Sequence, residues 1–313
     1  VRMRVDGALR TVMSLPPAGL APLTSRIKIM ASLDIAQRRI PQDGRAQVTV
    51  NGLVHNLRIS TLPSLRGETV VIRLLNDIAE LPELRSLGIP ERMVPVVHAT
   101  LRASQGLLLI TGPTGSGKTT TLYSAINEVV TGERNLITVE DPVEIELPGV
   151  TQVQIDEKSG MTFEAGLRAM MRQDPDILMV GEIRDQQTAS LAIRAALTGH
   201  LVLATVHTND AASAMTRLLD MGIEHYLLTS TINAVLAQRL VRRLCPECRE
   251  PFAPDEELVK RLELRALTDK EPVLYRPAGC PSCNGSGYAG RTMILELMVT
   301  DDTIRALVLR RAE

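Results

Sequence analysis

The residues best suited to chemistry form one continuous run. It reads Gly112, Pro113, Thr114, Gly115, Ser116, Gly117, Lys118 and Thr119, and Thr120 follows. An apolar segment, 107–110, precedes the run, and a segment with a helical pattern, 120–130, comes after it. This is the sequence and context of a phosphate-binding loop, whose glycines let several backbone N–H groups converge on one anion at a helix N-terminus. The alternative interpretation is a glycine-rich turn that binds nothing.

Lys118 and Thr119 indicate what such a loop binds. In phosphate-binding loops the lysine reaches the β- and γ-phosphates of a nucleotide, and the hydroxyl of the next residue binds Mg²⁺. Residues 112–120 therefore predict a site for a nucleoside triphosphate and Mg²⁺.

Two acids and a histidine follow the other apolar runs in this part of the chain. Glu140 follows 136–139, Glu182 comes soon after 177–180, and His207 follows 201–206. These runs lack alternation, as is typical of strands in a parallel sheet covered by helices on both faces. Ligands bind at the carboxyl ends of such strands, so we expect the three side chains to gather around Lys118. Each acid could instead be an ordinary loop carboxylate, and His207 a histidine hydrogen-bonded into the core.

Three apolar stripes at helical spacing separate or follow these runs. They consist of Phe163, Leu167, Met170 and Met171, then Leu191, Ile193 and Leu197, and then Leu227, Ile232, Val235 and Leu236. Strands that alternate with helices predict the α/β layers of a nucleotide-binding core over residues 89–313.

Residues 1–78 show a different pattern, which predicts a small α+β (PAS-like) domain. Alternation over 1–12 and 48–59, with Asp-Gly and Asn-Gly at the turns, predicts two hairpins, and 69–75 predicts a further strand. Apolar residues from Ile27 to Ile35 recur at helical spacing. The polar stretch 76–88 separates the two patterns, and we place the linker at 79–88.

Two arginines stand out in the strands of this first domain. Arg73 interrupts an apolar strand and Arg58 precedes the apolar Ile59. Antiparallel sheets commonly keep one face in water, so both side chains could be merely solvent-facing. The functional alternative is that they face an anion across a domain or subunit interface.

All four cysteines fall in two C-x₂-C pairs. Cys245 and Cys248 form one pair, Cys280 and Cys283 the other, with 31 residues between the pairs. Two thiolates on each of two tight turns can share a tetrahedral ion, whereas the alternative is two disulfides. A nucleotide-hydrolysing core implies a reducing cytosol, where structural disulfides are rare. The pattern therefore predicts a closed, structural Zn²⁺ site in a subdomain over 243–290.

Composition limits the classes of partner. The 313 residues are 44% hydrophobic and 2% aromatic, contain no Trp and carry a net charge of −1. Few aromatic side chains are present to stack on bases, and the charge gives no reason to expect a nucleic acid. No apolar run approaches the length of a membrane span. The chain begins at Val1 and ends in an amphipathic run without a stop signal, so we expect a piece of a longer protein.

Four motifs together resemble those of secretion ATPases of the type II/type IV pilus superfamily. They are the loop from Gly112, the aspartate box at 137–144, the atypical Walker B motif at 172–185 and the histidine box at 199–209. The resemblance implies a RecA-like P-loop NTPase core. It also implies that Glu140 is the general base for water, that Glu182 helps to hold Mg²⁺, and that His207 reads the γ-phosphate.

Further expectations come from the same resemblance. Members of the superfamily assemble as hexamers in which the smaller N-terminal domain packs over the nucleotide. The positions matching Arg58 and Arg73, with Arg168 and Arg172 before the Walker B strand, supply charge to the phosphates or hold the subunit interface. For Arg168 and Arg172, the competing interpretation is a solvated helix face with i,i+4 spacing.

The cysteine module resembles that of type II secretion and pilus-extension ATPases, which retraction ATPases typically lack. One departure is Met293-Ile294-Leu295-Glu296, where the family usually has Gly-Ile-Tyr-Glu. We therefore expect a cytoplasmic ATPase, hexameric when whole, that drives pseudopilus assembly in type II secretion and meets inner-membrane partners through a further N-terminal domain. The alternatives are a pilus-extension ATPase, a RecA-like nucleic-acid translocase and a nucleotide-gated scaffold.

Overall fold

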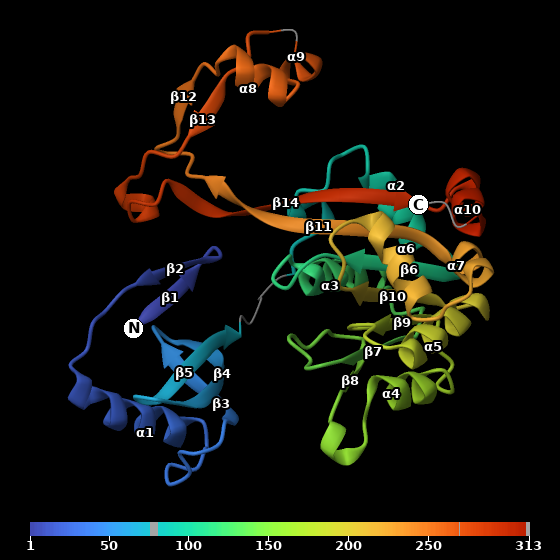
Figure 1. Ribbon diagram of the computed structural model, residues 1–313. Coiled ribbons are helices and arrows are strands. Elements are labelled where there is room, and N and C mark those ends of the chain that lie inside the picture. Colours follow the sequence, from blue (N-terminus) through green and yellow to red (C-terminus); the bar gives the residue numbers. More distant parts are fainter. Residues whose placement is uncertain (76–80, 269, 311–313) are drawn as a thin grey trace. The chain divides into compact units, whose positions relative to one another are not determined.

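The computed structural model describes residues 1–75, 81–268 and 270–310 (Figure 1). The chain divides into two compact units, Val1–Leu81 with Pro142–Pro148, and Pro82–Asp141 with Gly149–Glu313. Residues 76–80, in the stretch predicted to link two domains, lie outside the described residues.

The first unit contains a hairpin, a helix and a three-stranded antiparallel sheet. The hairpin is β1 (Arg2–Val5) and β2 (Ala8–Thr11), the helix is α1 (Leu20–Met30), and the sheet is β3 (Gln42–Val50), β4 (Leu53–Ser64) and β5 (Gly67–Leu75). Both predicted hairpins and the third strand are confirmed. The predicted helix was wrong at its end: α1 stops at Met30, and Ser32 has a φ of +56°, in the left-handed region that a helix cannot continue through.

A buried ion pair ties α1 to β5 within this unit. The Lys28 ammonium lies 2.5 Å from Glu68 Oε1, and only 1% of the Lys28 side chain is exposed. Lys28 Nζ also donates to the Gln37 carbonyl over 2.7 Å. The helix therefore packs on the sheet through an ion pair as well as through the apolar cluster of Ala46, Leu57 and Ile59.

The second unit is built on a seven-stranded sheet in the order β14-β11-β6-β10-β9-β7-β8. The strands are β6 (Gly106–Thr111), β7 (Leu136–Glu140), β8 (Thr151–Gln154), β9 (Ile177–Val180), β10 (Leu201–Val206), β11 (Ile232–Leu244) and β14 (Tyr288–Val299). Six are parallel, and β14 is antiparallel to β11 at the edge. The predicted parallel sheet is confirmed.

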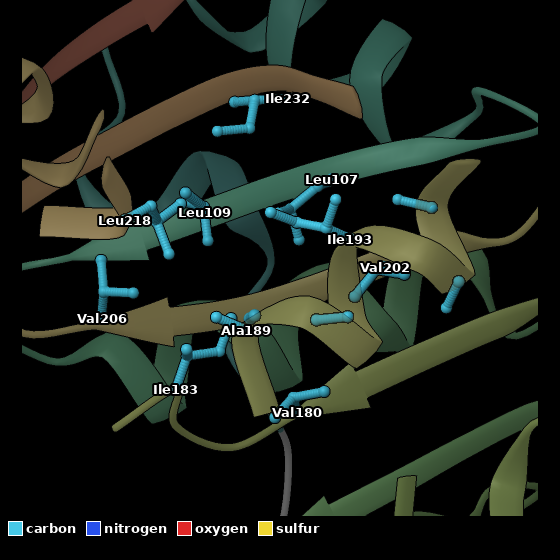
Figure 2. Close-up of a cluster of buried hydrophobic side chains, with 14 of the residues drawn as sticks. Leu107, Leu109, Val180, Ile183, Ala189, Ile193, Val202, Val206, Leu218 and Ile232 are labelled. Carbon is cyan, nitrogen blue, oxygen red and sulfur yellow. The ribbon is translucent and has the colours of Figure 1, made fainter. Parts of the chain in front are cut away.

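Helices cover both faces of this sheet. They are α2 (Val94–Leu101), α3 (Lys118–Val129), α4 (Phe163–Met170), α5 (Gln186–Leu197), α6 (Ala211–Asp220), α7 (His225–Thr231) and α10 (Asp302–Leu309). Figure 2 shows the core on one face, where Leu107, Leu109 and Val202 meet Ala189 and Ile193 of α5. The intervening strand residues, such as Leu108 and Leu203, are equally buried but point to the opposite face, and α3 packs against β6 and β10 from outside this cluster.

The third predicted helical stripe was wrong. The helix α7 ends at Thr231, and Ile232, Val235 and Leu236 belong to β11, which pairs in parallel with β6. β-Branched residues suit a central strand buried on both faces, and the sheet contacts outweigh the accidental helical spacing.

The β11–β14 ribbon continues past the sheet into a small module (Figure 1). The module contains β12 (Glu250–Phe252), α8 (Glu256–Arg261), α9 (Leu264–Leu267) and β13 (Leu274–Arg276).

Short 3₁₀ turns occur at Pro17–Gly19, Leu84–Leu87, Glu157–Ser159 and Pro281–Cys283. Among residues 1–75, 81–268 and 270–310, no helix is long and apolar enough to cross a membrane.

Candidate active site

The loop after β6 has the backbone that its glycines predict. Gly112 and Gly117 have φ values of +148° and +90°, and α3 begins directly afterwards at Lys118. A Cβ atom on Gly112 would lie 2.3 Å from the backbone oxygen of Gln238 in β11. Only glycine fits this position, so the loop can pass close against the neighbouring strand.

Lys118 folds back over the loop. Its Nζ donates to the carbonyls of Gly112, at 2.8 Å, and Pro113, at 3.3 Å, and lies 3.3 Å from His207 Nδ1. Partial burial lowers the pKa of Lys118, while the negative charge of Glu182 acts in the opposite direction. The ammonium therefore stands at the mouth of the loop, where phosphate oxygens would replace the carbonyl oxygens.

A chain of contacts runs from Lys118 across the ends of three strands. His207, after β10, places Nε2 2.9 Å from Glu182 Oε1, after β9. Because Lys118 donates to Nδ1, the neutral ring carries its proton on Nε2 and donates it to Glu182. Arg184 Nε donates to Glu182 Oε2 over 2.7 Å, and Arg184 Nη1 lies 3.5 Å from Asp141 Oδ2, after β7. The hydrogen bond to Glu182 raises the pKa of Arg184.

Glu140, the last residue of β7, lies outside this chain of contacts. It is only 3% exposed. Its Oε2 accepts from the hydroxyl of Tyr123 in α3, and its Oε1 accepts from Thr138 Oγ1 at 2.5 Å and from Gln152 Nε2 at 3.0 Å. Both carboxylate oxygens thus accept hydrogen bonds from protein donors, and burial restricts the access of water to Glu140.

The four predicted arginines occupy different surroundings. Arg168 binds Glu164 of the same helix, with Nη2 2.8 Å from Oε1, and Arg172 donates to the Arg168 carbonyl. Arg58 and Arg73 belong to the first unit, where they lie directly opposite each other on β4 and β5. The structure therefore brings together Lys118, Glu182 and His207 of the predicted residues, while Glu140, Arg168 and Arg172 make other contacts.

Three residues near the site were not predicted from the sequence. Arg184 could have been found, because it stands two residues after Glu182 and an acid at a site needs a cation to balance it. Tyr123 could have been suspected as a polar tip on a buried face of α3. Gln238 gave no signal, since it lies in a strand whose place beside the loop is set by the sheet.

The four cysteine sulfurs form one cluster, and all lie within 4.8 Å of one another. The Sγ–Sγ distances are 3.9 Å for Cys245–Cys280, 3.8 Å for Cys248–Cys283 and 3.7 Å for Cys280–Cys283. A tetrahedron of sulfurs about 2.3 Å from a central Zn²⁺ has edges of about 3.8 Å. The donor set therefore fits a tetrahedral thiolate site.

Backbone groups of the module favour thiolate sulfur. The N–H groups of Cys280 and Gly287 donate to Cys283 Sγ at 3.2 and 3.1 Å, and the N–H of Gly279 donates to Cys248 Sγ at 3.3 Å. The hydrogen bond from Cys280, helped by that from Gly287, lowers the pKa of Cys283 to about 6, whereas burial raises the pKa of Cys248 to about 12 against the hydrogen bond from Gly279. Donors of this kind orient metal ligands and stabilise their charge.

A family model described as Type II/IV secretion system protein matches residues 1–313. The chain belongs to this family. The predicted resemblance to secretion ATPases is thereby confirmed.

Curated relatives cover almost all of the chain. It is 50% identical over 309 residues to the type II secretion system ATPase E of Vibrio cholerae, with 98% of this chain and 61% of the relative covered. Identity to the type II secretion system protein E of Pseudomonas aeruginosa is 53% over 308 residues, with the same coverage. Identity to the type IV pilus assembly ATPase PilB of Thermus thermophilus is 48% over 305 residues, covering 97% of this chain and 34% of that protein. The chain thus spans 61% of the length of the secretion proteins.

Solved structures support the fold. The pilus retraction motor PilT with bound ADP is 26% identical, with a TM-score of 0.65 and coverage of 99% of this chain and 79% of PilT. The ATPase DotB of Legionella pneumophila, 23% identical, shares the fold with a TM-score of 0.66 over 97% of this chain and 75% of DotB. The predicted fold, a RecA-like core with a cysteine cluster that fits zinc, is confirmed.

Proposed function

We propose that this chain is the ATP-hydrolysing region of a motor for type II protein secretion. The observation that carries the proposal is the contact chain from Lys118 through His207 to Glu182, at the mouth of a phosphate-binding loop. In this group, a cation that can bind phosphate contacts residues whose positions can respond to the γ-phosphate. The names of the relatives and the ADP bound to PilT support the same function.

The residues of the loop act first on the substrate. The backbone N–H groups of the loop receive the phosphates of ATP, and Lys118 exchanges its carbonyl partners for phosphate oxygens. His207 keeps contact with Lys118 through Nδ1, so its ring moves with the lysine when the γ-phosphate is present. Glu182 is held by His207 and Arg184, and its alignment therefore depends on the same event.

Mg²⁺ and the attacking water use the remaining groups. Thr119 and Glu182 are the proposed Mg²⁺ ligands, and the ion neutralises charge on the β- and γ-phosphates when it is bound. The Thr119 hydroxyl is the first on α3, and one Glu182 oxygen must leave His207 or Arg184 to become a ligand. Glu140 is the proposed general base. Its partner Tyr123 lies on α3, so a shift of α3 against β7 changes the access of water to Glu140.

The four cysteines are proposed to hold structural Zn²⁺, which fixes the module at the end of the β11–β14 ribbon. All four positions around the ion are filled by thiolates, so no open position remains for a substrate.

Assembly and location are parts of the same proposal. We infer a homo-hexamer when the protein is whole, in the cytoplasm and peripheral to the inner membrane through secretion-platform partners. Opening and closing of residues 1–78 against the core would transmit the nucleotide state. A net charge of −1 and an aromatic content of 2% do not favour a nucleic acid as a partner.

Pilus extension is a second candidate function, because PilB of Thermus thermophilus is 48% identical. Deletion of the gene separates the two. Loss of secreted proteins with intact pili supports secretion, whereas loss of pili with intact secretion supports pilus extension.

Replacing Lys118 with Ala tests the enzymatic function. The unsubstituted chain should hydrolyse Mg·ATP, and the variant should lose hydrolysis by about 100-fold or more while keeping its thermal unfolding midpoint, since Lys118 contributes charge and little packing. Equal phosphate release by both proteins would contradict the proposal.

A further inference from the structure

A side chain on the strand next to the loop fixes the loop's shape. The strand β11 pairs with β6 as far as Ala237, which stands opposite Thr111, the last residue of β6. Gln238 is the next residue, so it lies where β6 gives way to the loop. Only 2% of Gln238 is exposed, and its Nε2 donates to the carbonyl of Ser116 over 2.9 Å.

This one hydrogen bond determines where the next N–H group points. The peptide between Ser116 and Gly117 is planar and trans, so its C=O and N–H point in opposite directions. Since the carbonyl points at Gln238, the N–H of Gly117 points away from β11. Within the described part of the chain, that N–H has no acceptor. It is a free donor at the N-terminus of α3, where an anion is favoured.

Two more contacts place Gln238 directly beneath the loop. Its backbone oxygen is the atom that excludes any side chain from Gly112, and its Nε2 lies 3.3 Å from where a Cβ on Gly117 would stand. Two neighbouring polar atoms, Ser116 Oγ and Gln238 Oε1, are buried without partners among the described residues. Unpaired buried polar groups are rare in folded proteins, so this pair of atoms calls for an explanation.

We propose that Gln238 is a positioning residue for phosphate binding, which turns the 116–117 peptide so that the Gly117 N–H faces the nucleotide phosphates. The inference rests on the proposed ATP site and adds a residue from outside the sequence motif of the loop. Gln238 acts through the backbone and does not touch the substrate.

The test compares Gln238→Met with a matched variant on the same strand. Methionine keeps the length and volume of glutamine but cannot donate. Asn233 also donates its side-chain amide to a backbone carbonyl, that of Gln105 over 2.9 Å, at the opposite end of β6. Asn233→Ala therefore removes the same kind of bond from β11 without changing the phosphate loop.

Titration of the full chain with Mg·ATP and Mg·ADP gives the readout. For Gln238→Met we expect both dissociation constants to rise about tenfold. The KM for ATP should rise as well, while kcat should stay within about threefold of that of the unsubstituted chain. The reason is that the hydrogen bond from the Gly117 N–H to the phosphates is weakened equally in the ground state and in the transition state. Asn233→Ala should bind like the unsubstituted chain. If Gln238→Met does not fold, Gln238→Leu, which is apolar, close in volume and without a donor, should show at least the same loss.

Three results would be decisive against this inference. A folded Gln238→Met or Gln238→Leu protein with unchanged nucleotide affinity overturns it and leaves the ATP site standing. An equal loss of affinity in Asn233→Ala shows a general effect of β11 stability, and also overturns it. Failure of the unsubstituted chain to bind Mg·ATP overturns the proposed function, and this inference with it.

Discussion

At the scale of the residue, the shape of the phosphate loop depends on close approach between backbones. Gly112 and Gly115 both have positive φ, at +148° and +78°, so a side chain strains either position. Only Gly112 also faces an obstacle, because its Cβ would lie 2.3 Å from the Gln238 oxygen, whereas nothing lies within 4 Å of a Cβ on Gly115. Both positions therefore require a positive φ, but only Gly112 also requires the absence of a Cβ atom next to β11.

Gly112→Ala and Gly115→Ala separate these requirements. Gly115→Ala should lose about 1–2 kcal/mol of unfolding free energy from the strained backbone, and Gly112→Ala should lose more, because the clash with the Gln238 oxygen adds to the strain. Gly112→Ala should in addition lose Mg·ATP binding by about tenfold or more, since the loop must move away from β11. Thermal unfolding and nucleotide titration provide the measurement, and equal ATP affinity in the two variants would contradict this account of the loop.

At the scale of the element, parallel strands bring distant residues to one edge. Glu182 and His207 follow β9 and β10; His207 contacts Lys118 at the start of α3, and Glu182 contacts His207. Strand β11 serves two sites: Gln238 lies under the loop, and Cys245 follows its last residue. The cysteine module lies at the end of two strands of the same sheet, β11 and β14.

Removal of metal should affect the cysteine module and spare the sheet. We expect about one Zn²⁺ per chain, and chelation should expose the segment between Cys245 and Cys283 to proteases, because the module loses the ion that holds its two cysteine pairs together. Cys283→Ser should lower zinc content in the same way. Metal analysis with limited proteolysis measures this, and a chelated module that resists proteases as well as the loaded one would contradict it.

At the scale of the whole molecule, the first unit presents a row of like charges. Arg45 pairs with Arg58, and Arg58 with Arg73, across three adjacent strands. Like charges directly opposite each other destabilise a sheet. We propose that Arg58 and Arg73 face an anion when the protein works.

Arg58→Ala and Arg73→Ala test this proposal. Each should lower kcat for ATP hydrolysis by about 100-fold, since each removes charge from the transition state, while the unfolding midpoint stays unchanged or rises. Arg66→Ala is the control, because Arg66 lies exposed in the turn between β4 and β5. If Arg66→Ala lowers kcat as much as the other two, a general loss of positive charge is responsible.

How far the sequence predicts this molecule differs among its parts. The loop, the parallel strands and the cysteine cluster follow from local patterns, since glycine spacing, uninterrupted apolar runs and C-x₂-C pairs each have a direct physical cause. Strand β11 was mistaken for helix, because Ile232, Val235 and Leu236 fit helical spacing and only the sheet decides otherwise. Gln238 and Tyr123 act on residues far away in sequence, so their contacts appear only in the fold.

The different surroundings of Glu140 and Glu182 give the central claim its most direct test. Glu140 is buried among three donors, and Glu182 touches the lysine's histidine partner. Phosphate release from saturating Mg·ATP should be compared for the full chain, Glu140→Gln and Glu182→Gln. The account predicts turnover by the unsubstituted chain and a loss of phosphate release of about 100-fold or more in Glu140→Gln. Glu182→Gln should need a higher Mg²⁺ concentration for the same turnover. Unchanged phosphate release by Glu140→Gln would contradict the account.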